Sequence, residues 1–144
     1  MQSPLSESQR DGALAYLLLR ITMGMNILVH GISRVLAGHA SFAYSLLLLF
    51  QKTPLPGWSV FAFGWTLPWL EAALGLALLV GVKTRLVLIA GSLLIIVLTF
   101  GSTLRQDWTS AGLQLIYAAV YAGLLAFRSR NIYSLDSLFG TTRG

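Results

Sequence analysis

Seven side chains with chemistry of their own lie within otherwise apolar stretches of this sequence. They comprise a guanidinium, a carboxylate, an imidazole, two amides and two phenols: Arg20, Glu71, His30, Asn26, Gln114, Tyr117 and Tyr121. Such groups can hydrogen-bond a carbonyl-bearing ligand or carry protons. An ionisable group in hydrocarbon is costly, so it needs a partner or a function. The seven residues form our candidate binding pocket inside a membrane, and we assign none of them a catalytic role.

Arg20 and Glu71 are expected to pair. Glu71 is the only acidic residue inside a predicted membrane span. At 1.5 Å per residue, Glu71 lies about 16 Å and Arg20 about 10 Å above the same membrane face, a difference that a guanidinium side chain can cover. An unpaired charge in hydrocarbon is unfavourable enough to require this partner, a proton or water. Two interpretations stay open: a structural clamp that fixes helix register, or direct contact with a bound molecule.

The remaining candidates are expected to lie around that pair. Asn26 and His30 share a helical arc of about 120° with Arg20. Gln114, Tyr117 and Tyr121 share an arc of about 60° on a later helix, with Gln114 near the depth of His30. The tyrosines either donate protons or hydrogen bonds to a ligand, or only join helices through their hydroxyl groups.

His30 is the only histidine inside a predicted span. Metal or haem ligation is disfavoured because no Met, Cys or carboxylate stands three or four residues further on. Two other roles stay open. His30 is either a hydrogen-bonded side chain facing a polar pocket, or a donor to a quinone-like carbonyl or a proton relay.

Composition places these residues in a membrane protein. Hydrophobic residues make up 56% of the 144-residue chain and charged residues 10%, and the mean hydropathy is +0.73. The chain has no cysteine, which excludes thiol chemistry and cysteine-bound clusters from it. Glycine-rich nucleotide loops, phosphate loops, nucleophile elbows and paired carboxylates are also absent from the sequence. No covalently bound cofactor and no nucleic-acid partner are expected, and any electron carrier must be bound from outside the chain.

Four apolar stretches predict four membrane-spanning helices. They cover residues 12–36, 58–82, 86–104 and 108–127. Residues 41–52 are apolar but too short to cross, and proline follows them, so they predict a re-entrant or interfacial helix. The sequence thus predicts an all-α integral membrane four-helix bundle at 12–130, with a polar tail at 1–11 and an amphipathic tail at 131–144. The second tail is expected to lie along the membrane surface.

The distribution of basic residues predicts the orientation. Four spans place both termini and the 83–85 turn on one side, and most Lys and Arg near span ends lie there: Arg10, Lys83, Arg85, Arg128, Arg130 and Arg143, against Arg34, Lys52 and Arg105. By the positive-inside rule both termini are cytoplasmic. The first span lacks a small-x-small cleavage pattern, so we expect it to remain as an uncleaved helix.

Three stretches within residues 14–138 resemble the DoxX family. LLLRITMGMNILVHGISRVL resembles its first helix, with Arg20, Gly24 and the His30–Gly31 pair in place. WLEAALGLALLVGVKTRLVLIAGSLL resembles its second and third helices, including Glu71, and IYSLDSL resembles the sequence after its fourth helix. The chain departs from the family pattern at Arg34, where lysine is usual.

The resemblance implies a multi-pass protein of the bacterial inner membrane, similar to the membrane subunit of a thiosulfate:quinone oxidoreductase. A quinone-linked redox subunit is therefore the first functional hypothesis, with quinone as the cofactor class. The alternative is a non-catalytic accessory or assembly subunit. A solute carrier ranks last because no internal repeat or pair of broken helices is visible. The expected partners are the lipid bilayer, membrane or periplasmic oxidoreductase subunits, and a second copy of the chain.

Overall fold

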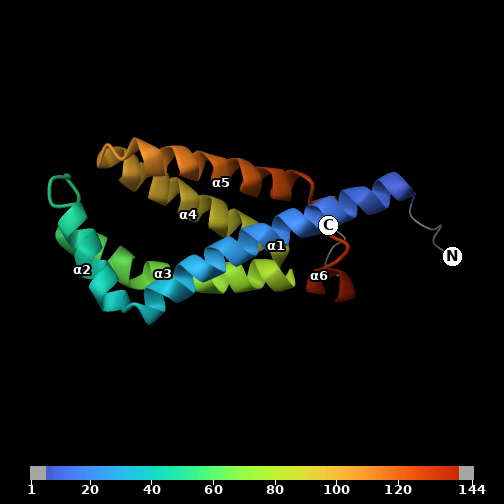
Figure 1. Ribbon diagram of the computed structural model, residues 1–144, viewed down its shortest axis with the longest axis horizontal. Helices are drawn as coiled ribbons and strands as arrows, with labels where there is room; N and C mark the ends of the chain where they lie inside the picture. Colours follow the sequence, from blue (N-terminus) through green and yellow to red (C-terminus); the bar gives the residue numbers. More distant parts are fainter. Residues whose placement is uncertain (1–5, 140–144) are drawn as a thin grey trace.

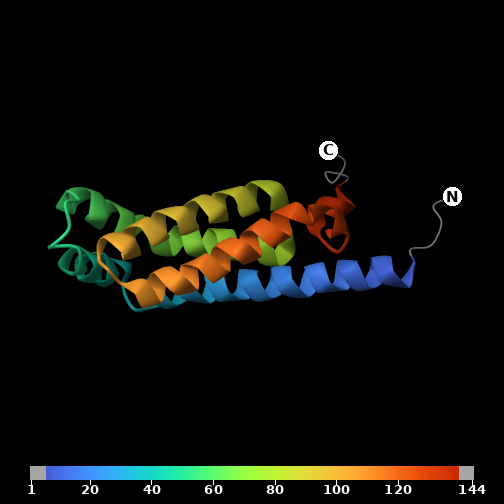
Figure 2. The same cartoon turned by 90° about the horizontal axis from the view of Figure 1, so that it is seen from above.

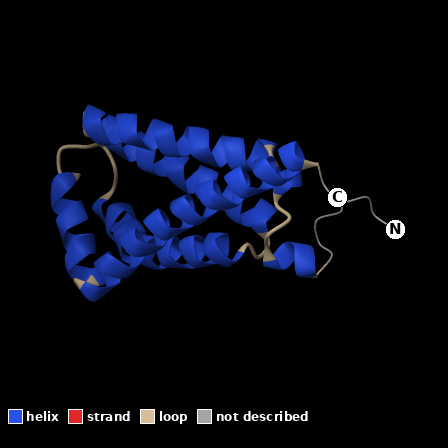
Figure 3. Cartoon of the chain, turned by 45° about the vertical axis from the view of Figure 1, so that its right-hand side comes forward, coloured by secondary structure: helices blue, strands red, loops and turns tan. Residues whose placement is uncertain are grey.

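The computed structural model describes residues 6–139, and that range contains helices and no strand (Figure 1, Figure 3). The helices are α1 (Glu7–Leu36), α2 (His39–Leu49), α3 (Gly57–Val80), α4 (Thr84–Leu104), α5 (Trp108–Ala126), the 3-10 turn η1 (Arg128–Arg130) and α6 (Leu135–Leu138). Helices α1, α3, α4 and α5 are each long and apolar enough to cross a bilayer. The predicted all-α four-helix membrane bundle is confirmed, with the short helix α2 between its first two spans.

The bundle is built from two helix pairs. Helix α1 packs mainly on α3, and α4 packs mainly on α5. Helix α2 packs on α3 at one end of the bundle, and α6 lies at the other end (Figure 1, Figure 2). The two ends of the molecule therefore differ: one is closed by α2 and the other by the C-terminal segment.

Helix α1 begins earlier than the sequence analysis predicts. Ser6 caps it by accepting a hydrogen bond from the backbone N–H of Gln9, and the Gln9 side chain accepts from the Ser6 N–H in return. This reciprocal capping box satisfies N–H groups that have no partner within the helix. The helix therefore starts at Glu7 rather than at residue 12. The predicted polar tail at 1–11 is partly helical, and its residues 1–5 lie outside the described residues.

Glycines set the register between α1 and α3. A Cβ atom added to Gly24 would lie 2.9 Å from the Leu79 backbone nitrogen, and one added to Gly31 would overlap the Ala72 backbone. Gly75 fits against α1 in the same way, at Leu28. Small residues let membrane helices approach closely enough for extensive backbone contact. The two helices are therefore antiparallel, with Gly24 near Leu79 and Gly31 near Ala72.

The C-terminal segment folds back onto the turn between α3 and α4. The Asp136 carboxylate accepts hydrogen bonds from the backbone N–H groups of Lys83 at 2.6 Å and Thr84 at 2.7 Å. The Asp136 N–H donates to the Gly81 carbonyl oxygen at 3.0 Å. A carboxylate at this position accepts hydrogen bonds from N–H groups that have no partner within the helix, and its negative charge interacts favourably with the positive end of the α4 dipole. These contacts hold residues 131–138 on the α3–α4 turn. That the amphipathic tail lies along the membrane surface stays a prediction, and residues 140–144 lie outside the described residues.

Candidate functional site

The seven predicted site residues do not gather around one space. Arg20 lies at the α6 end of the bundle and is only 2% exposed. Its guanidinium donates to the carbonyl oxygen of Leu78 at 3.0 Å and to that of Tyr133 at 2.7 Å. Arg20 thus connects α1 to the end of α3 and to the C-terminal segment.

The predicted Arg20–Glu71 pair is wrong. Glu71 is buried, as expected, but its carboxylate pairs with the guanidinium of Arg34 in the last turn of α1. The glycine contacts place Arg20 level with Gly81, where an added Cβ would overlap the Arg20 guanidinium. Gly81 is ten residues beyond Glu71, or about 15 Å along the helix. The prediction failed because it placed Arg20 about 10 Å inside the membrane face at which α3 ends. Arg20 instead lies level with that end of α3, and the preceding turns of α1 extend beyond it (Figure 1).

Asn26, His30, Tyr117 and Tyr121 lie in the middle of the bundle in two different settings. The Asn26 side-chain amide donates to the Tyr117 hydroxyl at 3.1 Å, which joins α1 to α5. His30 is exposed, and its Nδ1 lies 3.0 Å from the Asn26 carbonyl oxygen. Tyr121 is 1% exposed, with its ring packed against Gly91. Asn26, Tyr117 and Tyr121 therefore contact neighbouring helices, and His30 faces out of the bundle.

A cavity of about 420 Å³ lies at the α2 end of the bundle, between α2, α3, α4 and the start of α5. Its walls are mainly apolar and include Phe42, Leu46 and Phe50 from α2, Phe63 and Leu67 from α3, and Leu98 from α4. The volume is within the usual range for a small-molecule site. Of the seven predicted residues, Gln114 lines this cavity, and Glu71 reaches its edge through the lining residue Arg34.

Arg34 and Glu71 form the first of two ion pairs at the cavity. Arg34 lines the cavity and retains 29% side-chain exposure, whereas the Glu71 side chain is 5% exposed. The Arg34 guanidinium also lies 4.8 Å from the centre of the Phe42 ring on α2. A buried carboxylate needs its counter-charge, and an arginine packed on an aromatic face has a restricted position. This pair therefore links α1, α2 and α3 where they meet at the cavity.

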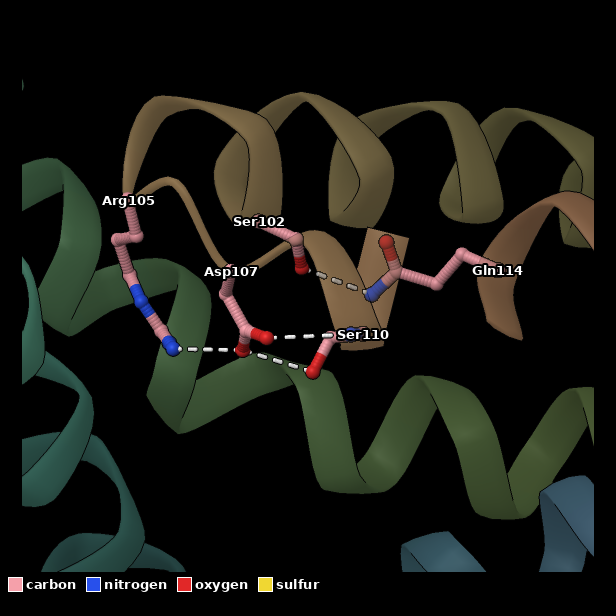
Figure 4. Close-up of polar contacts among 5 residues, drawn as sticks. All are labelled: Ser102, Arg105, Asp107, Ser110 and Gln114. Atoms are coloured by element: carbon pink, nitrogen blue, oxygen red, sulfur yellow. Dashed lines mark hydrogen bonds and ion pairs between the residues drawn. The ribbon is translucent and has the colours of Figure 1, made fainter. Parts of the chain in front are cut away.

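The second ion pair lies in the turn between α4 and α5 (Figure 4). Arg105 Nη2 lies 2.9 Å from Asp107 Oδ2, and the guanidinium is 5.3 Å from the centre of the Phe50 ring. Asp107 also caps α5: its Oδ1 accepts from the Ser110 N–H at 3.1 Å and its Oδ2 from the Ser110 hydroxyl at 2.7 Å. The hydroxyl and backbone N–H of Ser110, followed by the Arg105 charge, hold the pKa of Asp107 below its ordinary value.

Gln114 lies one turn beyond Ser110 on α5 and adds to the polar side of the cavity. Its side-chain nitrogen donates to the Ser102 hydroxyl at 3.0 Å (Figure 4). Both residues line the cavity together with Arg105, Asp107 and Ser110. The polar side chains of the cavity are thus gathered around the α4–α5 turn and at Arg34, while the α2 and α3 walls are mostly apolar.

The charges at the cavity cancel, but hydrogen-bond donors remain. Arg34 and Arg105 each pair with one carboxylate, and within residues 6–139 each guanidinium donates a single hydrogen bond. A guanidinium carries five N–H donors. Since the two acids balance the two bases, the site favours a neutral acceptor such as a carbonyl oxygen over a strongly charged anion.

Sequence reasoning missed most of this wall. Arg34 enters the sequence analysis only as a basic residue near a span end and as a departure from the family pattern, not as a site residue. Asp107 falls in the connection between the predicted spans 86–104 and 108–127 and is not among the predicted site residues, although Asp three residues before Ser at a helix start is an N-cap pattern. The positions of Phe42 and Phe50 depend on how α2 folds over the bundle, and the sequence carries no signal for that packing.

The described part of the chain, residues 6–139, contains no group of three His, Asp or Glu side chains placed to hold a metal ion. Comparisons with protein-family models, with curated proteins and with solved structures found no match for this chain. Fold and site together define a class: an all-α protein with four helices suited to span a membrane, and a largely apolar cavity with a polar wall at one end.

Proposed function

We propose that this protein is a multi-pass subunit of the bacterial inner membrane that binds a quinone in the cavity at the α2 end. One observation carries the proposal: an apolar cavity of about 420 Å³ with two charge-balanced guanidinium groups on its polar side. A quinone has a flat apolar ring and two neutral carbonyl acceptors, which suit such walls and such donors. The resemblance of three stretches to the DoxX family is an independent reason to propose a quinone as the ligand.

The redox reaction needs a partner. A quinone takes up two electrons and two protons to become a quinol, and we propose that an oxidoreductase subunit of the membrane or periplasm supplies the electrons. The protons come from water. The residues of this chain position the quinone: Arg34 and Arg105 donate hydrogen bonds to its carbonyl oxygens, and Phe42 and Phe50 hold the guanidinium groups in place.

We retain the orientation predicted by the positive-inside rule, with both termini cytoplasmic. The cavity is lined by residues of α2 and of the α4–α5 turn, and Figure 1 shows these elements at the end of the bundle away from α6. With the C-terminal segment on the cytoplasmic side, the cavity faces the periplasmic half of the membrane. A periplasmic or membrane electron donor then reaches the quinone without crossing the bundle.

Titration of a quinone analogue tests this proposal. Saturable quenching of tryptophan fluorescence is expected in the native protein, and Glu71→Gln should weaken binding about tenfold because Arg34 loses the carboxylate that positions it. Glu7→Gln, an equal change at an exposed position on α1, is the matched control and should bind like the native protein. Absence of saturable binding by folded native protein contradicts the proposal.

The accessory or assembly subunit is the second candidate, and the contacts of Arg20 favour it. Arg20 is the most buried charged residue of the described chain. Its guanidinium donates hydrogen bonds to backbone carbonyl oxygens of α3 and of the C-terminal segment, and these contacts stabilise the fold. Under this alternative the polar residues only fix helix positions. Folded native protein that binds no quinone, yet is retained by a partner oxidoreductase subunit, supports this candidate over the first.

A further inference from the structure

The cavity at the α2 end has an apolar mouth. Three of its lining residues are largely exposed, and all three are apolar: Leu49 at 57%, Val97 at 47% and Phe100 at 56%. The polar lining residues, including Arg105, Asp107 and Gln114, are less exposed. The opening is therefore bounded by apolar side chains, and the polar side chains lie deeper in the cavity.

This mouth lies between α2 and α4. Leu49 is the last residue of α2, and Val97 and Phe100 belong to α4, one of the spanning helices. Helix α2 packs mainly on α3, so its contact with α4 is slight. Phe50 makes that contact: a Cβ added to Gly101 would lie 3.1 Å from the Phe50 ring. The cavity thus opens sideways, toward the space that lipid chains fill around a spanning helix.

We propose that the ligand of this cavity is a membrane-dissolved quinone whose hydrocarbon tail leaves the protein between α2 and α4, past Leu49, Val97 and Phe100. The inference rests on the proposed function and names its substrate class: a long-tailed lipid quinone rather than a water-soluble one. The head group lies against Arg34, Arg105 and the α4–α5 turn. The tail follows the apolar mouth into the bilayer, so the ligand enters without crossing water.

The test compares two probes that share one head group: a dimethoxy-methyl-benzoquinone without a side chain, and the same ring with a decyl chain. Binding of each is measured on native protein and on Val97→Trp, in which a bulky ring occupies the mouth. Ile96→Trp is the matched control, because Ile96 is a lipid-facing neighbour, 62% exposed, that does not line the cavity. Leu49→Trp gives a second, independent block from the α2 side of the mouth.

Val97→Trp and Leu49→Trp should each weaken the decyl probe about tenfold, the size of effect that forced repacking produces, while the short probe changes by less than about twofold. Ile96→Trp should leave both probes unchanged. Comparing variants cancels the preference of the tailed probe for detergent or lipid, because that preference is common to all of them.

Three other results would overturn the inference. If the folded Trp variants bind both probes like the native protein, or weaken both equally, the tail does not use this mouth and the inference is overturned, while the quinone site stands. A phospholipid that co-purifies in the mouth and is not displaced by the decyl probe also overturns the inference. If native protein binds neither probe, the proposed function fails and the inference fails with it.

Discussion

Arg20 on α1 donates a 2.7 Å hydrogen bond to the backbone carbonyl oxygen of Tyr133, beyond the last spanning helix. The same guanidinium donates to the Leu78 carbonyl oxygen at 3.0 Å, so one side chain joins three segments that are distant in sequence. A guanidinium presents several donors in a rigid plane, whereas an ammonium is a compact charge on a flexible stem. This contact, and not a pairing with Glu71, accounts for an arginine inside the first span.

Arg20→Lys should therefore destabilise the bundle and release the C-terminal segment. The ammonium cannot reach both carbonyl oxygens, and losing one charged hydrogen bond from a buried site costs about 2 kcal/mol. Denaturant unfolding in detergent measures the stability, and limited proteolysis reports the release of residues 131–138. Arg10→Lys, an equal change at an exposed position on α1, should leave both readouts unchanged. Native-like protection of the segment in Arg20→Lys would contradict this role.

Asp136→Ala should destabilise the end of the molecule next to α6. The carboxylate accepts from the backbone N–H groups of Lys83 and Thr84 at the start of α4, and removing such a cap costs about 1 kcal/mol or more. Thermal unfolding measures the loss, with the exposed Asp11→Ala on α1 as its control. Equal melting temperatures for the two variants would show that the cap contributes nothing.

Two glycine substitutions should have opposite effects. Gly31→Ala places a methyl group on the Ala72 backbone, so α1 and α3 must separate, and overpacking of this kind costs about 1–3 kcal/mol. Gly112→Ala on α5 meets nothing within 4 Å and should stabilise the helix by about 0.5–1 kcal/mol. Unfolding of both variants under identical conditions checks the register, since another register would move the penalty away from Gly31.

Asp107 predicts a pH dependence. Its pKa is lowered in the folded protein by the hydrogen bonds from Ser110 and by Arg105, so the folded state binds this proton less readily than the unfolded chain. The stability it confers is full above the ordinary value of 3.8 and is lost as the pH falls through the lower folded value. Asp107→Asn lacks this titration. The melting-temperature advantage of the native protein over the variant should shrink below pH 3.8, and an advantage independent of pH would refute the assignment.

The spans could be predicted from the sequence because they depend on one-dimensional signals. Long apolar runs interrupted by charges at 83–85 and 105–107 suffice to place α3, α4 and α5. The short run before Thr53 and Pro54 likewise indicated α2. The start of α1 was placed five residues late, because the capping box at Ser6 lies in a polar stretch that hydropathy does not mark.

The candidate site could be predicted only in part, because it depends on register. Residue types showed correctly that Arg20 and Glu71 are buried. Their partners follow from how Gly24, Gly31 and Gly75 fit against the facing helix, and an error in how far α1 is shifted along α3 exchanges Arg34 for Arg20. The cavity itself arises where α2, packed on α3, brings Phe50 to the end of α4. That packing joins residues far apart in sequence, such as Phe50 and Arg105, and no local pattern specifies it.

Photo-crosslinking with an azido-quinone is the most direct test of the central claim that the cavity at the α2 end holds a quinone. The account predicts label on the peptides that contain residues 42–50 and 97–110, and loss of that label when excess unlabelled quinone competes. Label confined to the α6 end around Arg20, or label that competition does not remove, would contradict it.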